Sequence, residues 1–375
     1  MTLLLDLPRI HFGPGCAERL PEVLTRLGVR RPLLVTDRGV RASGAIDGVL
    51  ALLGGPNALV FDGVTEPPCF AAIELAAAAY RSAACDGVVA AGGGSVIDTA
   101  KMLAILATHP GSVERYAGHA DRIVTAVAPL VVLPTTAGSG SEVSPSTGIH
   151  PAAGRPGLRT RSSALVPRAA LCDPELTVSM PPRLTAATGL DALTHCIEGF
   201  LSPIENPLVD AIALAGIPRI AGRLVRAVSD GSDRDARASL MMGALAGGIG
   251  IGKGLGPAHA MATAFSHWPV PHGILAALSL PPSLELLQRH VPAKLATVAA
   301  AMGLPPGVSV ADGFRSLLRS LNARSGIPLT LHAAGVRGGD QDALAQDCAD
   351  SPVNRSSPYV PTAAEYRQLI AAAIG

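Results

Sequence analysis

The sequence predicts an α/β domain with a doubly wound, mostly parallel sheet over residues 1–177, followed by an all-helical domain over residues 178–375. Three observations support this prediction. The first half alternates short β-branched runs with Ala- and Leu-rich helical patterns, strand signals nearly vanish after about Asp173, and a Pro-rich connector separates the two parts. Alternation of strand and helix is typical of a parallel sheet covered by helices.

Within the first domain, each expected strand is a short apolar run, and Ala-rich helical segments lie between the runs. Ligands of such sheets gather at the carboxyl ends of the strands, so polar residues that follow a strand are candidate site residues. The expected strands are 32–37, 58–62, 87–92 and 130–134, and the expected helices are 73–84 and 96–108.

The second domain is expected to consist of amphipathic helices without an internal repeat. Its apolar residues recur with helical spacing, which indicates helices that bury one face. The expected helices are 184–201, 207–228, 233–247, 275–289, 292–302, 310–325 and 363–373.

Composition limits the classes of function. The chain has 375 residues, 48% of them hydrophobic, which is enough for two packed domains. A formal net charge of +1 argues against a nucleic-acid or membrane partner, and an aromatic content of 3% argues against stacking on single strands. Six cysteines without CxxC spacing indicate reduced thiols, and we find no signal peptide or membrane-spanning run, so we expect a cytoplasmic protein.

A candidate metal site is formed by one acid and three histidines. Asp191 and His195 are one helical turn apart and share a helix face, and His259 and His272 follow in apolar or small-residue surroundings. This ligand set suits a divalent transition metal such as iron or zinc. Taken separately, these residues are more often a surface pair and core histidines, but a buried charge needs a partner, and the four together favour a site.

Two Gly- and Ser-rich segments follow predicted strands. In Gly92–Lys101 the backbone can approach a phosphate at a helix N-terminus, although a plain tight turn is the alternative and the pattern is not GxGxxG. In Pro134–Glu142 the hydroxyls suit a phosphate, a ribose or a nicotinamide amide, although a solvated loop would also be polar. Asp37 ends a strand and is placed to accept from a ribose hydroxyl, or else to cap a helix.

A third glycine-rich segment resembles a P-loop without meeting its requirements. In Gly247–Gly254 the last residue replaces the Ser or Thr that the motif needs, and no strand precedes it. Close helix packing beside the metal site is the better explanation of these glycines.

These segments together resemble the iron-dependent (group III) alcohol dehydrogenases, which have the dehydroquinate synthase-like fold. The resemblance extends from about residue 8 to the C-terminus. The matching segments, in the order and spacing of the family, are 61–68, 92–101, 135–142, 173–177, 189–198, 253–260 and 271–273.

The resemblance implies a metal-dependent oxidoreductase that transfers a hydride between NAD(P) and a small alcohol or aldehyde. The metal, held by Asp191, His195, His259 and His272 in a cleft between the domains, would polarise the substrate oxygen. The family implies iron, although the same ligands accept zinc, and it implies a homodimer. Asp37 favours NAD over NADP. The implied cofactor-binding residues are Asp37, Gly93, Gly94, Ser95, Asp98, Thr135, Thr136, Ser139 and Ser144.

The sequence departs from the family at two places. Many members carry a histidine, often assigned to proton transfer, where this chain has Thr263; His267, one turn further, could act catalytically if the helix persists. A cofactor-contacting lysine of the family is missing near Gly157, where Arg155, Arg159 and Arg161 cluster instead. These arginines would contact the cofactor, attract an acidic substrate, or simply be solvated.

Three alternatives follow from the fold. A reductase of an acidic carbonyl compound, similar to phosphonoacetaldehyde or maleylacetate reductases, is the nearest, although the latter commonly lack the acid found at Asp191. A lyase or cyclase similar to dehydroquinate synthase would use a different metal set with a Glu ligand. A non-catalytic member of the fold is the third.

Overall fold

The computed structural model describes residues 6–124 and 126–375, which divide into two compact units. The first unit contains the described residues up to Thr136 together with Ser141–Met180, and the second contains Ala137–Gly140 and Pro181–Gly375. This division lies beside the predicted boundary after residue 177. The short segment Ala137–Gly140, expected in the first domain, groups with the second unit instead.

The first unit is built on a parallel sheet with the strand order β1-β8-β5-β4-β2-β3. The predicted strands are present, the one expected at 58–62 only as a two-residue strand, whereas β1 and β8 were not predicted. A separate antiparallel hairpin pairs β6 with β7. The strands are β1 (Arg9–Phe12), β2 (Pro32–Val35), β3 (Val60–Phe61), β4 (Gly87–Gly92), β5 (Leu130–Pro134), β6 (Ser146–Ile149), β7 (Leu158–Arg161) and β8 (Ala169–Cys172).

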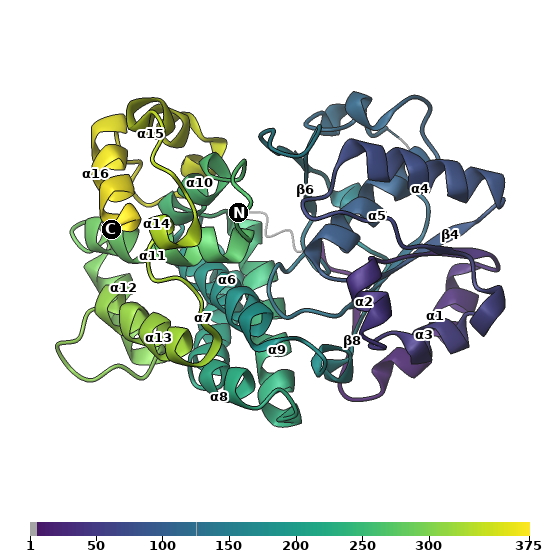
Figure 1. The fold of residues 1–375 in the computed structure, drawn as a ribbon, viewed down its shortest axis with the longest axis horizontal. Helices are drawn as coiled ribbons and strands as arrows, with labels where there is room; N and C mark the ends of the chain where they lie inside the picture. The colour runs from purple at the N-terminus through teal and green to yellow at the C-terminus, as the bar shows by residue number, and fades with distance from the viewer. Residues whose placement is uncertain (1–5, 125) are drawn as a thin grey trace. The chain divides into compact units, whose positions relative to one another are not determined.

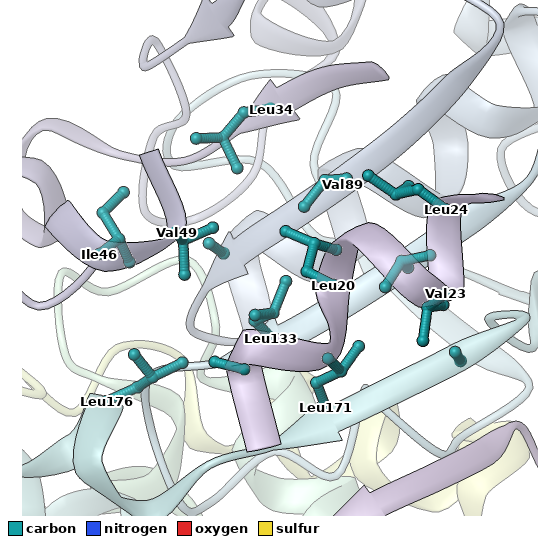
Figure 2. Packing of buried hydrophobic residues seen from close by; sticks show 14 of the residues in the cluster. Leu20, Val23, Leu24, Leu34, Ile46, Val49, Val89, Leu133, Leu171 and Leu176 are labelled. Carbon is teal, nitrogen blue, oxygen red and sulfur yellow. The ribbon is translucent and has the colours of Figure 1, made fainter. Parts of the chain in front are cut away.

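Helices cover both faces of this sheet (Figure 1). Side chains alternate between the faces along each strand, so every second residue of the central strands joins one core. Figure 2 shows this core beneath α1 and α3, where Leu20, Leu133 and Leu171 lie together. The helices of the unit are α1 (Leu20–Leu27), α2 (Arg38–Ala42), α3 (Asp47–Leu52), α4 (Phe70–Ser82) and α5 (Gly94–Leu106).

The strand order reverses between β2 and β4. From β2 the chain moves outward to β3, then returns past β2 to β4 and continues to β5 on the other side. Ligands of open α/β sheets bind at such a switch point, outside the carboxyl ends of the strands. The residues that follow these two strand ends are Asp37 and the turn that begins at Gly93.

The second unit is helical, and no strand occurs in the chain after Cys172, all of which is described. The helix predicted at 207–228 is two helices, because the chain breaks at Gly222 and Arg223. The helix at 257–264 was not predicted. The helices are α6 (Pro182–Leu201), α7 (Pro207–Ala221), α8 (Leu224–Ser229), α9 (Arg234–Gly250), α10 (Pro257–Ala264), α11 (His272–Leu287), α12 (Pro292–Ala301), α13 (Val310–Ser325), α14 (Leu331–Ala334), α15 (Gln341–Asp350) and α16 (Ala363–Ile374).

No single helix in the described part of the chain is long and apolar enough to cross a membrane. One pair, Arg234–Lys253 with Pro257–Ala264, reaches the required length and hydropathy only when its two members are joined, and it bends by 93°.

Candidate metal centre and cofactor-binding edge

Helix α6 aligns three polar side chains on one face of a largely buried helix. Asp191, His195 and Glu198 occupy positions i, i+4 and i+7, which place them one above the other. All three are at least nine-tenths buried, with exposed fractions of 6%, 3% and 3%. Three buried polar groups in a row on an apolar helix require partners, and α10 supplies those of Glu198.

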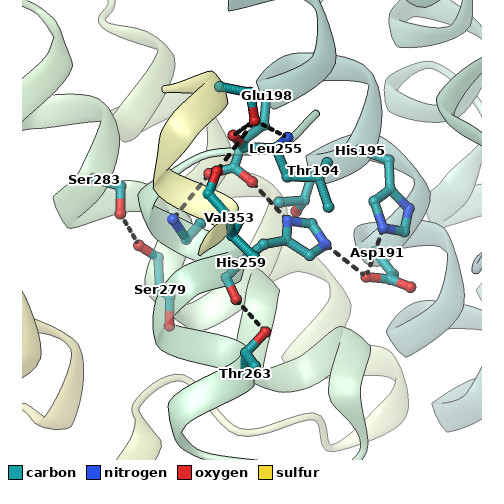
Figure 3. A network of polar contacts seen from close by, with 12 residues as sticks. Asp191, Thr194, His195, Glu198, Leu255, His259, Thr263, Ser279, Ser283 and Val353 are labelled. Carbon is teal, nitrogen blue, oxygen red and sulfur yellow. Dashed lines mark hydrogen bonds and ion pairs between the residues drawn. The ribbon is translucent and has the colours of Figure 1, made fainter. Parts of the chain in front are cut away.

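His259 on α10 completes a compact group of possible metal ligands (Figure 3). One ligand atom from each of Asp191, His195 and His259 lies within 4.8 Å of the other two. Asp191 Oδ1 is 3.9 Å from His195 Nε2 and 3.8 Å from His259 Nε2. The two imidazoles are stacked, with ring centroids 4.6 Å apart. These distances are too long for hydrogen bonds, and they leave the ligand atoms around one point.

The fourth predicted ligand, His272, lies beside this group but is not part of the compact set. It is the first residue of α11, it is exposed, and its ring centroid is 5.5 Å from that of His259. The start of α11 approaches α6 closely, because a Cβ on Gly273 would stand 2.9 Å from Asp191 Cβ and 2.5 Å from Ala187 O. A side chain at 273 would push His272 away from the site.

The polar atoms at the centre fit a divalent cation. Asp191 Oδ1 and His259 Nε2 are buried and have no hydrogen-bond partner, although buried polar atoms normally have one. Burial favours a raised pKa for Asp191, but His195 and the other imidazoles hold it below its usual value. Burial likewise lowers the pKa of His259, but Asp191 and Glu198 outweigh this effect and raise it to about 9. The site is therefore built for positive charge.

Glu198 is not among the site residues predicted from the sequence, yet it contacts the group directly. Its Oε2 accepts from His259 Nδ1 at 2.6 Å, and its Oε1 accepts from the Ala258 amide at 2.9 Å. The available signal was its position seven residues after Asp191, on the same face of the predicted helix.

The expected catalytic role of His267 required a helix that continues from Thr263 to His267, and the helix does not reach that residue. Helix α10 ends at Ala264, and His267 is exposed, with its Nδ1 3.0 Å from Ala264 O and its ring against Trp268. Thr263 donates its hydroxyl to His259 O at 2.8 Å (Figure 3). The interrupted helix removes the geometric reason for assigning His267 to the site.

The glycines of the P-loop-like segment that belong to α9 serve close helix packing, as expected, whereas Gly252 and Gly254 lie after the helix. Those of α9 lie at its end, which packs against α6. A Cβ on Gly247 would stand 2.8 Å from Ala192 O and 3.0 Å from His195 Cβ. The absence of a side chain at this position allows α9 to lie directly behind the ligand-bearing part of α6.

In the first unit, the turn after β4 leads into α5 without a side-chain cap. Gly93 is the N-cap residue and makes no side-chain hydrogen bond to the helix, so free amides of the first turn face outward at Gly94 and Ser95. A Cβ on Gly93 would stand 3.3 Å from Thr136, which follows β5. The two predicted phosphate-binding segments therefore lie next to each other at the strand ends.

Other predicted cofactor residues have partners within the protein. Asp98 accepts from Ser141 Oγ at 2.9 Å and from the Gly148 amide at 2.8 Å, while Ser144 Oγ accepts from the Ser146 amide at 3.1 Å. Asp37 caps α2 by accepting from the Val40 amide at 2.8 Å, which is the alternative foreseen for it. Thr135 is buried, and Ser139 lies in Ala137–Gly140.

Comparison with family models covers nearly the whole chain. A model described as iron-containing alcohol dehydrogenase matches residues 8–174. A model described as the C-terminal part of the Fe-containing alcohol dehydrogenase family matches residues 185–374. The first match ends, and the second begins, near the division between the two compact units.

Individual proteins are also similar over their full length. The chain is 39% identical to the 4-hydroxybutyrate dehydrogenase of Cupriavidus necator over 384 residues, which cover 99% of both chains. The crystal structure of a 1,3-propanediol oxidoreductase matches with a TM-score of 0.91 and 32% identity, covering 100% of both chains. The sulfoacetaldehyde reductase from Bifidobacterium kashiwanohense, in complex with NAD⁺, matches with a TM-score of 0.87 and 25% identity, covering 100% of both.

Proposed function

Because this chain belongs to the iron-containing alcohol dehydrogenase family and is therefore an oxidoreductase of alcohols and aldehydes, we propose that Asp191, His195, His259 and His272 hold its metal ion. One observation carries the proposal: two buried, unpartnered ligand atoms, Asp191 Oδ1 and His259 Nε2, face each other at 3.8 Å. A cation between them would satisfy both.

Ferrous iron is the ion we propose, with zinc as the alternative. The family name supports iron, and a set of one carboxylate and imidazoles suits both ions. Metal analysis of protein purified without air, followed by separate reloading with each ion, distinguishes the two.

The nicotinamide dinucleotide is proposed to bind at the carboxyl ends of β2, β4 and β5. The uncapped N-terminus of α5 at Gly93, Gly94 and Ser95 suits the pyrophosphate. Asp37 stands at the switch point, where a carboxylate accepts from a ribose hydroxyl and repels a 2′-phosphate, so NAD is the proposed form. Thr135, Thr136, Ser139 and Ser144 are proposed to line the nicotinamide end of the cofactor. Asp98 accepts from Ser141 Oγ and so holds the loop that carries Ser141 in place.

In the proposed mechanism a metal ion held by Asp191, His195, His259 and His272 would supply Lewis-acid polarisation of the substrate oxygen, and a bound nicotinamide would supply hydride transfer at the substrate carbon. Asp191 supplies the negative charge that retains the ion, and the His195 and His259 rings are fixed by burial. Thr263 keeps its hydroxyl on His259 O, and no ionisable side chain takes its position on α10. We therefore propose that a water molecule accepts the proton that an alcohol substrate releases.

The substrate is proposed to be a small molecule with a terminal hydroxyl or aldehyde group, as in the named relatives. A second candidate is a substrate that also carries an acidic group. Arg159 and Arg161 are exposed and alternate along β7, so they share one face of the hairpin, and two of the relatives are named for a carboxylate and a sulfonate substrate.

A substrate panel tests both candidates. The protein is loaded with Fe²⁺ under argon and assayed by the absorbance of the reduced nicotinamide. The panel pairs NAD⁺ and NADP⁺ with small alcohols that include 1,4-butanediol and 4-hydroxybutyrate, and it pairs NADH and NADPH with the corresponding aldehydes. Metal-dependent turnover of either alcohol with NAD⁺ supports the proposed function, and no metal-dependent turnover of any alcohol or aldehyde contradicts it. A preference of at least about tenfold in kcat/KM for the acid, about 1.4 kcal/mol, that Arg159→Ala removes supports the acidic substrate.

We also propose that the protein is cytoplasmic and forms a homodimer. The described chain contains six free cysteines, four of them buried, which supports the proposal of a reducing, cytoplasmic environment. A homodimer is proposed from the family resemblance alone, and the molar mass from light scattering during size-exclusion chromatography tests it.

A further inference from the structure

We propose that Glu198 is a positioning residue of the metal centre, which holds the Nδ1–H of His259 and so directs Nε2 of that ring toward the metal ion. The inference rests on the metal site proposed above and adds a residue to it. Glu198 lies on the same face of α6 as Asp191 and His195, one turn further along the helix. Its carboxylate is beside the imidazole, on the side opposite Asp191 (Figure 3).

The contacts fix which nitrogen of His259 carries the proton. Glu198 Oε2 is 2.6 Å from His259 Nδ1, and an ionised carboxylate only accepts hydrogen bonds, so Nδ1 is the donor. In the neutral ring, which is the form that binds a metal ion, Nε2 then keeps its lone pair. That lone pair is on the nitrogen that lies 3.8 Å from Asp191 Oδ1, at the centre of the ligand group.

The carboxylate itself is held in one position. Its second oxygen accepts from the amide of Ala258 at 2.9 Å; Ala258 is the second residue of α10, so this amide belongs to the positive end of the helix. A Cβ on Gly256 would stand 2.9 Å from Glu198 Oε1, so the glycine is what lets the chain pass this close. Glu198 has an exposed fraction of 3% and His259 of 2%, so water does not compete for either contact.

Two roles are consistent with these contacts and have different consequences. A carboxylate on the distal N–H of a metal-bound imidazole fixes the ring and increases its basicity, and its loss typically lowers metal affinity about 10- to 100-fold. In the second role, Glu198 would only link α6 to α10. Its loss would then lower the stability of the fold but leave the metal affinity of the folded protein unchanged. Metal affinity and the ligand-field spectrum therefore separate the two roles, independently of turnover.

The test is Glu198→Gln in the full-length protein. The amide has the size of the carboxylate, but its NH₂ group must face one of the two N–H donors. We expect the Kd for Co²⁺ of the metal-stripped variant to rise about 10- to 100-fold and the visible absorption bands of bound Co²⁺ to shift. Thr194→Val is the matched control, because it removes a buried hydroxyl of α6, bonded to Leu190 O at 2.8 Å, next to His195. Its Co²⁺ affinity and spectrum should be those of the wild type.

The outcomes separate this inference from the proposed function. Wild-type affinity and an unchanged Co²⁺ spectrum in Glu198→Gln overturn the role of Glu198 while leaving the metal site in place. Failure of the wild-type protein to bind Co²⁺ or Zn²⁺ overturns the metal site and this role together. If the variant does not fold, ¹⁵N NMR of the histidines in the Zn²⁺-loaded wild type decides: a proton on His259 Nδ1 supports the role, and a proton on Nε2 overturns it.

Discussion

Asp191 is the residue on which the proposed chemistry depends most. It is 6% exposed, and its Oδ1 lies within 3.9 Å of ring nitrogens from two helices while making no hydrogen bond of its own. A buried carboxylate in this condition is costly unless a cation neutralises it. The neighbouring histidines supply part of that charge without a metal, since they hold the pKa of Asp191 below its usual value against the effect of burial.

Asp191→Asn keeps the size of the side chain and removes its charge. We expect the iron content of the purified protein to fall well below one ion per chain. We also expect kcat/KM for the best alcohol to fall by at least about 100-fold, because loss of a ligand costs more than loss of the groups that orient it. Metal analysis and the nicotinamide absorbance assay measure the two effects. Full turnover in the variant would contradict the proposed mechanism.

His267→Ala should leave turnover nearly unchanged. The side chain is exposed, outside α10, and bonded to the backbone at Ala264 O. A general base in use contributes about 10²- to 10⁴-fold to the rate, so a change of less than about threefold shows that His267 does not fill this role. The kcat and its pH dependence are measured for the variant beside the wild type. A 100-fold loss of kcat would support a catalytic role of His267.

Helical geometry alone predicted the site residues whose relation is local, whereas His259 and His272 were predicted from their surroundings and from the family resemblance. Asp191 and His195 are four residues apart on a helix that the pattern reveals, so their juxtaposition followed from helical geometry. Glu198 follows the same geometry, but its partner His259 is 61 residues away, and no local pattern shows that a carboxylate will meet a distant ring nitrogen. The expectation for His267 depended on helical spacing that continues past Thr263, and the structure ends α10 at Ala264.

At the level of elements, the loop before α10 determines the position of His259. Gly254 has a φ of +97°, and a Cβ there would stand 2.0 Å from Ser356 Oγ. That hydroxyl accepts from the Leu255 amide at 3.1 Å and donates to Leu255 O at 3.0 Å. Ser356 belongs to the short 3₁₀ segment Pro352–Ser356, so a C-terminal segment fixes the entry to the ligand helix.

Gly254→Ala should destabilise the protein strongly. The added Cβ meets both an unfavourable backbone conformation and the Ser356 hydroxyl, so we expect a loss of about 3 kcal/mol or more in the free energy of unfolding. Gly252→Ala, two residues earlier, meets no atom within 4 Å, and its effect should remain within about 1 kcal/mol. Chemical denaturation measures both, and equal stabilities would contradict the account of this loop.

A second element, the loop between β5 and β6, is held to α5 by buried charged groups. Lys101 donates to Ser144 O at 2.8 Å and to Ser146 O at 2.7 Å. Burial lowers the pKa of Lys101 to about 8, although Asp98 and Glu142 oppose the shift. Burial raises the pKa of Glu142 to about 7, although Lys101 opposes it. We therefore expect the loop that carries the proposed nicotinamide-side hydroxyls to be sensitive to pH.

Glu142→Gln should become more stable relative to the wild type as the pH rises from 5 to 8. The folded wild type retains a proton on Glu142 up to about pH 7, whereas the unfolded chain releases it near its ordinary value of 4.5. The wild type therefore loses stability across this window, by at most about 3 kcal/mol, and the amide variant does not. Denaturation at several pH values measures the difference, with exposed Glu18→Gln as the baseline. A difference that does not change with pH contradicts the prediction.

Elements with strong local signals were predicted correctly, and those that depend on tertiary pairing were not. The apolar runs of β2, β4 and β5 are sufficient to identify them. Strand β8, Ala169–Cys172, contains two alanines, which have low strand propensity, and β1 is a mixed four-residue segment; both form because each pairs with a neighbour. The break between α7 and α8 falls at Gly222, inside an otherwise continuous helical pattern.

At the scale of the molecule, the metal ion and the dinucleotide are proposed to bind to residues of different compact units. Each unit has its own buried core, and the proposed metal ligands lie in the second while Gly93, Gly94 and Ser95 lie in the first. A ligand stabilises the part of the protein that it binds, by about 2.7 kcal/mol at 100 times its Kd.

Hydrogen exchange followed by mass spectrometry should show this division. We expect Zn²⁺ to slow amide exchange mainly in α6, α10 and the start of α11, and NAD⁺ to slow it mainly in the turn after β4 and in α5. Removal of the metal with a chelator should reverse only the first effect. Protection of the helical segments by NAD⁺ in the absence of metal, with none around Gly93, would contradict the assignment of the dinucleotide to the first unit.

The most direct measurement of the central claim is a crystal structure of the protein loaded with Fe²⁺ under argon, with anomalous diffraction recorded at the iron edge. We expect one strong peak per chain, bonded to Asp191, His195, His259 and His272 at about 2.0–2.2 Å. The absence of a peak at this position in crystals that contain iron, or a peak bound elsewhere, would contradict it.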